Sequence, residues 1–262
     1  MTVAAAPRSR LSFGGAVRSE FRKMSTVRAM WWVAIVSAIL GPFAALTTDH
    51  GAPPPGEEAA WTMAAAASAV IGPWLIVAIY AALQATGEWS SGQYRVSFAT
   101  VPRRNLWLAA KAAAVGIYAA AVALIVLVLS VLVTLAQSGA TVDWTAGYTW
   151  QVLLGGPVAF ALTAALSVAI GALVRSSGVA VTIVVGLLVV LPFAGVFGAF
   201  GLDLVGHITS YLPSGAADAI VGSGAFGPAA DDLGVGPGVA VLVAWVAVAS
   251  IAASVAMNNR DA

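Results

Sequence analysis

The sequence predicts an all-α protein with six membrane-spanning helices. Of its 262 residues, 60% are hydrophobic and only 9% are charged, with a mean hydropathy of +0.94, whereas soluble domains carry about a quarter charged residues. Six apolar segments are each long enough to cross a hydrocarbon core about 30 Å thick as a helix. They are residues 29–48, 61–86, 106–136, 148–174, 179–200 and 235–257. We expect one membrane domain over residues 1–262.

The charges divide between two sides of this map. All 12 Lys and Arg residues lie in the N-terminal segment, in residues 87–111, in the turn 175–178 or at the C-terminus, together with three acids. The other three loops hold eight acids and none of the basic residues. The two sets carry net charges of +9 and −8, consistent with +1 for the chain. Because Lys and Arg are retained in the cytoplasm, we expect both termini and residues 87–111 to be cytoplasmic.

An apolar stripe precedes the first span and has the spacing of one helical face. It consists of Phe13, Val17, Phe21 and Met24, and three cations lie off it, namely Arg18, Arg22 and Lys23. This pattern favours an amphipathic helix lying in the headgroup layer, with Trp31 and Trp32 marking the interface. The alternative is a segment whose cations only set the topology. The run 29–48 lacks a clear cleavage site, so we expect it to be a retained span.

Residues 87–111 form too long a connection for a simple turn between the second and third spans. Gly87, Gly92 and Pro102 punctuate it. Aromatic residues mix with polar ones at Trp89, Tyr94 and Phe98, and two adjacent arginines follow Pro102. Aromatic and Arg side chains are enriched where proteins bind partners. This composition is compatible with both a docking element and a solvated loop. By contrast, only "RSSG" at 175–178 joins the fourth and fifth spans, which predicts a tight hairpin.

The segments "EWSSGQYR" (88–95) and "VPRR" (101–104), followed by Lys111, come after "SEFRKMSTVRAMWW" and before "YLPSGAADAI" (211–220). This order resembles permease subunits of type-2 ATP-binding cassette (ABC) exporters. The resemblance implies a coupling helix between spans 2 and 3 that rests on a separate ATPase, beside the N-terminal interfacial helix. It also implies an extracellular segment between spans 5 and 6. The matching coupling residues are Glu88, Gly92, Arg95, Pro102, Arg103 and Arg104. Gln93 departs from the Thr or Ser of many members.

A nucleotide-binding loop requires GxxxxGK[ST], yet the chain's two lysines, Lys23 and Lys111, are followed by Met and Ala. We therefore expect no catalytic residue, metal or cofactor in this chain, with ATP and Mg²⁺ bound by a partner subunit. The resemblance implies two ATPase subunits, a second permease copy or paralogue, surrounding lipids, no nucleic acid and a bacterial inner membrane location.

No ionisable residue lies centrally in any predicted span, which argues against a carrier driven by protons or sodium ions. The expected function is export of a hydrophobic or amphiphilic substrate such as a drug, lipid or peptide, with the direction implied by the resemblance. The alternative is a non-transporting membrane sensor or immunity protein that binds a partner through its outer loops.

Overall fold

The computed structural model describes residues 12–47, 56–100, 103–139, 141–193, 203–224 and 233–260. Within these ranges the chain is helical and contains no strand, so the all-α prediction is confirmed. Five described helical segments are long and apolar enough to cross a membrane: Arg28–Thr47, Glu58–Ser90, Arg104–Ser138, Gly147–Val174 and Val235–Asn259. The predicted span 179–200 begins as the shorter apolar helix Ser177–Val190, and its end lies outside the described residues. The six-span topology stays a prediction.

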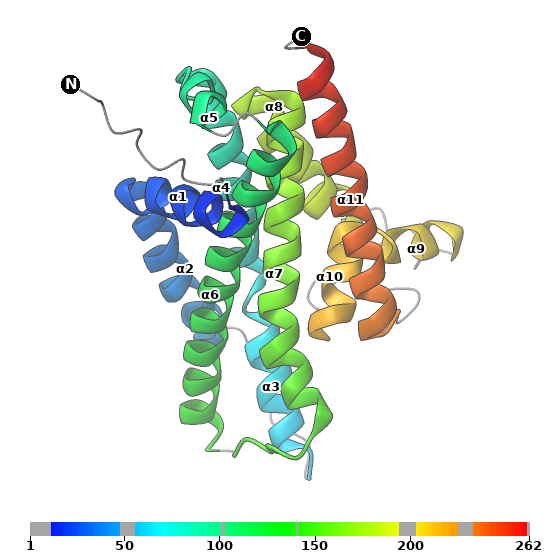
Figure 1. Cartoon of the computed structure of the whole chain (residues 1–262). Helices are drawn as coiled ribbons and strands as arrows, with labels where there is room; N and C mark the ends of the chain where they lie inside the picture. The colour runs from blue at the N-terminus through cyan, green and yellow to red at the C-terminus, as the bar shows by residue number, and fades with distance from the viewer. Residues whose placement is uncertain are drawn as a thin grey trace, which may run out of the picture.

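The first helix, α1 (Phe13–Thr26), lies across the long axis of the bundle (Figure 1). Its N-terminus is capped by Ser12, whose hydroxyl accepts a hydrogen bond of 3.1 Å from the amide of Gly15. One residue in an extended conformation, Val27, ends α1 and turns the chain into α2 (Arg28–Thr47). The helix α1 packs mainly on α6 (Arg104–Ser138). It is therefore fixed against the side of the bundle.

The predicted span 61–86 is built from two helices, α3 (Glu58–Ser68) and α4 (Ile71–Ser90). The break falls at Ala69 and Val70, just before Pro73. Proline has no N–H to donate to the carbonyl four residues earlier, and its ring crowds that carbonyl, so a helix is interrupted there. The segment between α4 and α6 contains the short helix α5 (Tyr94–Thr100).

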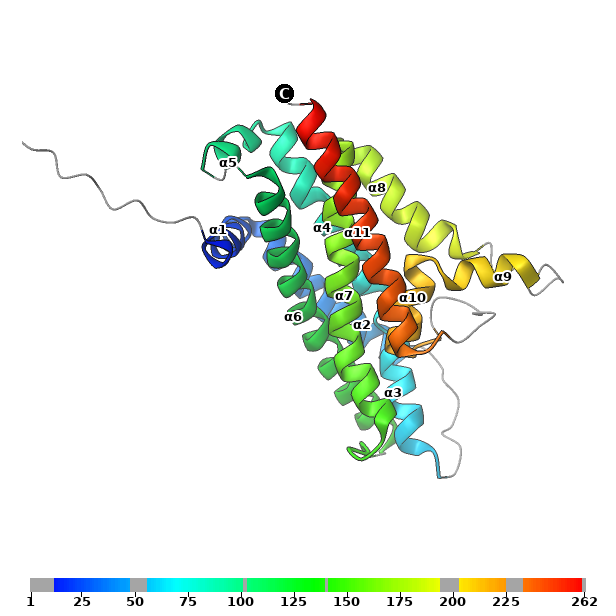
Figure 2. The same ribbon diagram turned by 45° about the vertical axis from the view of Figure 1, so that its right-hand side comes forward.

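The central helix is α7 (Gly147–Val174), which contacts α4, α6, α10 (Pro213–Val221) and α11 (Val235–Arg260) (Figures 1 and 2). Small residues permit these contacts. A Cβ atom added at Gly171 would lie 2.6 Å from the carbonyl oxygen of Ala82 in α4. One added at Gly155 would lie 2.4 Å from the carbonyl oxygen of Ile220 in α10. Side chains at these two positions would push the helices apart.

The helices α7 and α8 (Ser177–Val185) are separated by two residues, Arg175 and Ser176, which is the tight hairpin expected from the sequence. A π-helical turn, Gly186–Val190, continues α8. Between this turn and α11 the chain forms α9 (Asp203–Ser210) and α10. The helix α10 buries Ala216, Ala217 and Ile220 and packs on both α7 and α11.

Candidate functional site

The connection between α4 and α6 lies at the end of the bundle where α11 also ends (Figure 1). Gly92 adopts a left-handed conformation with φ of 73°, which glycine reaches without steric penalty. This residue lets the chain leave α4 and start α5 within a few residues. Gly92, one of the residues that punctuate this connection in the sequence, thus sets the direction of α5.

Four charged side chains meet beneath this connection and form the ion-pair cluster: Glu20 and Lys23 of α1, Glu88 of α4 and Lys111 of α6. The ammonium of Lys111 lies 2.8 Å from Glu20 Oε2 and 2.7 Å from Glu88 Oε1. The ammonium of Lys23 lies 2.6 Å from Glu20 Oε1 and 3.4 Å from Glu88 Oε1. Each lysine thus bridges both carboxylates, and the cluster has no net charge.

The hydroxyl of Ser97 attaches α5 to the ion-pair cluster. It donates a hydrogen bond of 2.9 Å to Glu88 Oε2 and accepts one of 3.0 Å from Lys23 Nζ. A seven-residue helix is marginal by itself, because its few internal hydrogen bonds barely offset the entropy of forming it. The position of α5 therefore depends on such contacts with α1 and α4.

Burial makes the pairing within the cluster necessary. The side chain of Lys111 is only 3% exposed and those of Glu20 and Glu88 are 6% exposed, whereas Lys23 is 30% exposed. A buried charge is tolerated only when opposite charge and hydrogen bonds replace the water that it loses. The cluster consequently holds α1, α4, α5 and α6 in one arrangement.

Aromatic rings also attach α5 to α4. The ring of Trp89 stacks on Tyr94 with centroids 4.5 Å apart, and its centroid lies 5.9 Å from that of Phe98. The guanidinium carbon of Arg175, from the turn between α7 and α8, lies 3.9 Å from the centroid of the Trp89 ring. A cation over an indole face is the strongest cation–π arrangement. Through this contact the α7–α8 hairpin also reaches α5.

Arg175 itself has a left-handed backbone, with φ of 60° and ψ of 9°. This conformation is unusual for a residue with a side chain and is commonly filled by glycine at the end of a helix. The amide of Arg175 donates to the carbonyl of Gly171 and closes α7 with a bond of 2.9 Å. The strained backbone is thus kept at the position from which the guanidinium reaches Trp89.

The arginines predicted for coupling fall into two groups. Arg95 and Arg103 are exposed. Within the described part of the chain, Arg95 Nε donates a hydrogen bond of 3.3 Å to the hydroxyl of the neighbouring Tyr94. Arg104 instead lies over Phe98, with 5.6 Å from its guanidinium carbon to the ring centroid, and donates to the carbonyl of Met257 in α11. The first group is available to a partner and the second joins two helices. Pro102 lies outside the described residues.

The predicted stripe on α1 is divided between two surroundings. Val17 and Met24 pack against the buried core, while Phe13 and Phe21 are exposed. The face turned to the bundle is formed by Ala16, Glu20 and Met24. Arg18 and Arg22 are exposed and Lys23 is half-buried. The helix α1 therefore has a buried face against the bundle, an exposed apolar edge with Phe13 and Phe21, and an exposed basic face with Arg18 and Arg22. The buried face contains an acidic residue, Glu20.

Sequence reasoning singled out Glu88 but missed its partners Lys23, Ser97 and Lys111, and it missed Glu20 as the second acid of the cluster. A signal was present, because Glu20 and Glu88 are among the three acids on a side that holds 12 basic residues. An acid retained among so many cations is a candidate for a specific ion pair. The contact between Arg175 and Trp89 had no comparable signal, since the two residues are far apart in the chain.

The model of the family described as ABC-2 family transporter protein matches residues 16–195. The match includes all four residues of the ion-pair cluster, α5 and the α7–α8 hairpin. No curated protein matches the sequence. This match confirms the resemblance carried by residues 88–111. The chain belongs to the ABC-2 family of transporter proteins, the membrane component of ABC transporters.

Proposed function

We propose that this chain is the membrane subunit of an ATP-driven exporter for a hydrophobic or amphiphilic substrate in a bacterial inner membrane. A separate ATPase subunit binds α5 and supplies the energy, and a second permease completes the pathway. The observation that carries the proposal is the attachment of α5, through Ser97, to the cluster that joins α1, α4 and α6. Family membership favours transport over the alternative of a sensor or immunity protein.

The contacts of α5 support its role as a coupling helix. A force on α5 acts on α1, α4 and α6 through the ion-pair cluster and on the α7–α8 hairpin through Trp89 and Arg175. The surface of α5 that faces away from these contacts includes Val96, which is 65% exposed, and Arg95. Arginine is enriched at protein interfaces, and Arg95 lies next to the exposed apolar side chain of Val96. The ATPase would bind there and at Arg103.

The interior of the bundle supports an apolar or amphiphilic substrate. Within the described ranges, the buried charged side chains are Glu20, Glu88 and Lys111 of the cluster at one end, and Asp218 in α10. The middle of the bundle instead contains neutral polar groups, such as Trp74, whose indole donates to the Thr163 hydroxyl at 3.1 Å. Charged groups along the path would be expected for a carrier of ions.

The proposal is tested by expressing the chain together with an ABC ATPase subunit from the same source and purifying the two together. The double variant Arg95→Glu/Arg103→Glu should weaken ATPase retention by about tenfold or more, equivalent to at least about 1.4 kcal/mol. The control, Asn258→Glu, adds an acid at an exposed position of α11 at the same end of the bundle and should retain the ATPase. Equal retention by all three proteins would remove α5 and Arg103 from the interface.

A further inference from the structure

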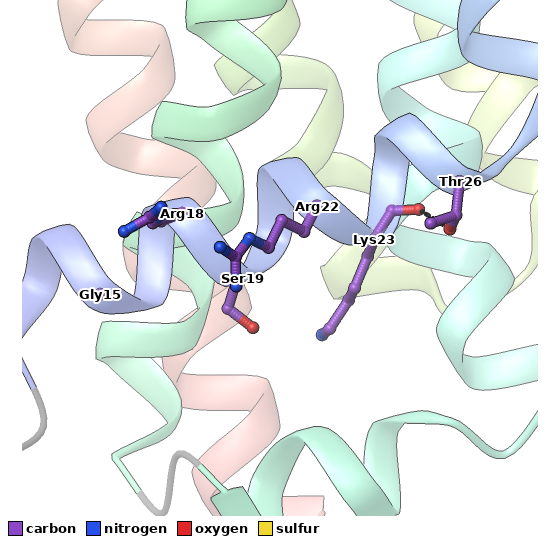
Figure 3. Close-up of a pocket in the computed structure, with 6 residues that line it drawn as sticks. All are labelled: Gly15, Arg18, Ser19, Arg22, Lys23 and Thr26. Carbon is purple, nitrogen blue, oxygen red and sulfur yellow. Dashed lines mark hydrogen bonds between the residues drawn. The ribbon is translucent and has the colours of Figure 1, made fainter. Parts of the chain in front are cut away.

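A hollow on the polar side of α1 shares Lys23 with the proposed coupling contacts, which use none of its other lining residues. Its lining consists of glycine, hydroxyl and basic residues of α1: Gly15, Arg18, Ser19, Arg22, Lys23 and Thr26. In Figure 3 the side chains of Ser19, Arg22 and Lys23 leave α1 on the same side. The lining thus offers hydrogen-bond donors and positive charge in one place, without an acid.

The positive charge of two of these residues is not balanced by nearby acids. Glu20 is the acid on α1, and the ion-pair cluster already matches it and Glu88 with two lysines. Arg18 and Arg22 form no ion pair within the described part of the chain. They are one helical turn apart, so both guanidinium groups project from adjacent positions of one face. The hollow therefore suits an anionic ligand.

Aromatic side chains set the depth of the hollow relative to a bilayer. Phe13 and Phe21 are exposed on α1, and Trp31 and Trp32 are exposed at the start of α2. The indole of Trp31 donates a hydrogen bond of 3.2 Å to the carbonyl of Ser25, which fixes it to the end of α1. Exposed tryptophans concentrate at the level of lipid headgroups. With its phenylalanines in the apolar layer, α1 has its arginines at the level of the phosphates.

We propose that Arg18 and Arg22, assisted by the hydroxyl of Ser19, bind the phosphate of an anionic phospholipid headgroup. A guanidinium presents paired N–H donors that match two phosphate oxygens, which an ammonium cannot do. Glu20, on the opposite face of α1, pairs with Lys111 of α6. A headgroup bound at the arginines would hold α1 from the lipid side while this ion pair holds it from the bundle side, and α1 in turn supports α5. This inference concerns α1 alone and does not rest on the proposed export function.

The test is native mass spectrometry of the purified full chain, titrated with phosphatidylglycerol or, as the neutral lipid, phosphatidylcholine. The double variant Arg18→Gln/Arg22→Gln should reduce phosphatidylglycerol affinity by about tenfold or more and leave phosphatidylcholine binding unchanged. The charge-preserving variant Arg18→Lys/Arg22→Lys should still bind phosphatidylglycerol at least threefold more weakly than the unaltered chain. Arg28→Gln, an exposed arginine outside the hollow, is the matched control and should bind nearly as the unaltered chain does. Circular dichroism of each variant checks that it is folded.

Four results would overturn the assignment. If the lysine variant binds as tightly as the unaltered chain, or Arg28→Gln loses as much affinity as the glutamine variant, only diffuse attraction to anionic lipid is present. If inorganic phosphate displaces the lipid completely at millimolar concentration, the ligand is free phosphate. If the glutamine variant loses its ATPase in purely neutral lipid, the arginines bind the partner subunit. Retention of the ATPase together with loss of phosphatidylglycerol supports the headgroup site.

Discussion

Replacing Lys111 with methionine is the most direct test of the ion-pair cluster. The substitution keeps the length of the side chain but removes the charge that lies 2.8 Å from Glu20 and 2.7 Å from Glu88. Lys23 then remains as the one cation of the ion-pair cluster in the described part of the chain, and its distance to Glu88 is 3.4 Å. The cluster changes from neutral to a net charge of −1 in a place where water has little access.

The expected loss of stability follows from these distances. With an effective dielectric constant of about 20, a pair of charges at this separation attracts by roughly 6 kcal/mol before any desolvation is counted. Most of that attraction is offset by the dehydration of the charges, and breaking a buried pair from one side destabilises proteins by about 3–5 kcal/mol. We expect Lys111→Met to lower the free energy of unfolding by this amount. Lys23→Met should lower it by about 1 kcal/mol, because Lys23 is partly hydrated and exposed pairs contribute little.

The measurement is a titration of each purified variant with sodium dodecyl sulfate in mixed micelles, followed by circular dichroism. Glu20→Gln/Lys111→Met is the charge-matched control, because it leaves Lys23 paired with Glu88. The double variant should lose less stability than Glu20→Gln and Lys111→Met lose when their separate losses are added. The difference should be about 0.5–3 kcal/mol, the range for residues in contact. Additive losses, or equal effects of Lys111→Met and Lys23→Met, would refute a cluster held together by its buried lysine.

Three further predictions concern other parts of the fold. Gly155→Ala forces α7 away from the α10 backbone and should destabilise the chain by about 1–3 kcal/mol in the same titration, whereas Gly147→Ala, with no atom within 4 Å, should change little. Arg175→Gly removes the cation–π contact but suits the left-handed backbone, so substrate-stimulated ATP hydrolysis should fall while stability is kept; unchanged coupling contradicts the link. Since the chain contains no cysteine, Trp144→Cys should react with an impermeant maleimide in intact cells and Val96→Cys only after lysis. The opposite pattern rejects the topology.

Hydropathy was sufficient to predict the helical class and the position of most apolar helices, because helix length in a bilayer is set by the hydrocarbon thickness. It did not reveal that the second predicted span consists of α3 and α4, since the residues around the break are as apolar as their neighbours. The presence of Pro73 does not by itself distinguish a bend from a break. Whether proline bends or breaks a helix depends on the neighbouring helices that re-satisfy the freed carbonyl groups, and these are not visible in one sequence.

The candidate site was predictable in its location and less so in its contacts. Breakers and aromatic residues identified the α4–α6 connection, and Glu88 was recognised from its place in the family pattern. The ion pair of Glu20 with Lys111 was not predicted, because long-range ion pairs leave no periodic signal in a sequence. Arg103 and Arg104 looked equivalent in the sequence, yet Arg103 is the exposed, extended residue before α6, whereas Arg104 is the first residue of the helix and reaches α11.

The location of the buried charges has a consequence for how α5 moves. If α5 were held only by apolar contacts, it could slide along the bundle with small changes in energy, because such contacts are non-directional. Ser97 and Glu88 instead impose a direction, since their hydrogen bond weakens steeply when its angle changes. A displacement of α5 must therefore either carry α1, α4 and α6 with it or break a buried polar contact. Breaking the contacts of the buried Lys111 costs more free energy than breaking those of the partly hydrated Lys23. We therefore infer that the ion-pair cluster, when it opens, opens first at Lys23.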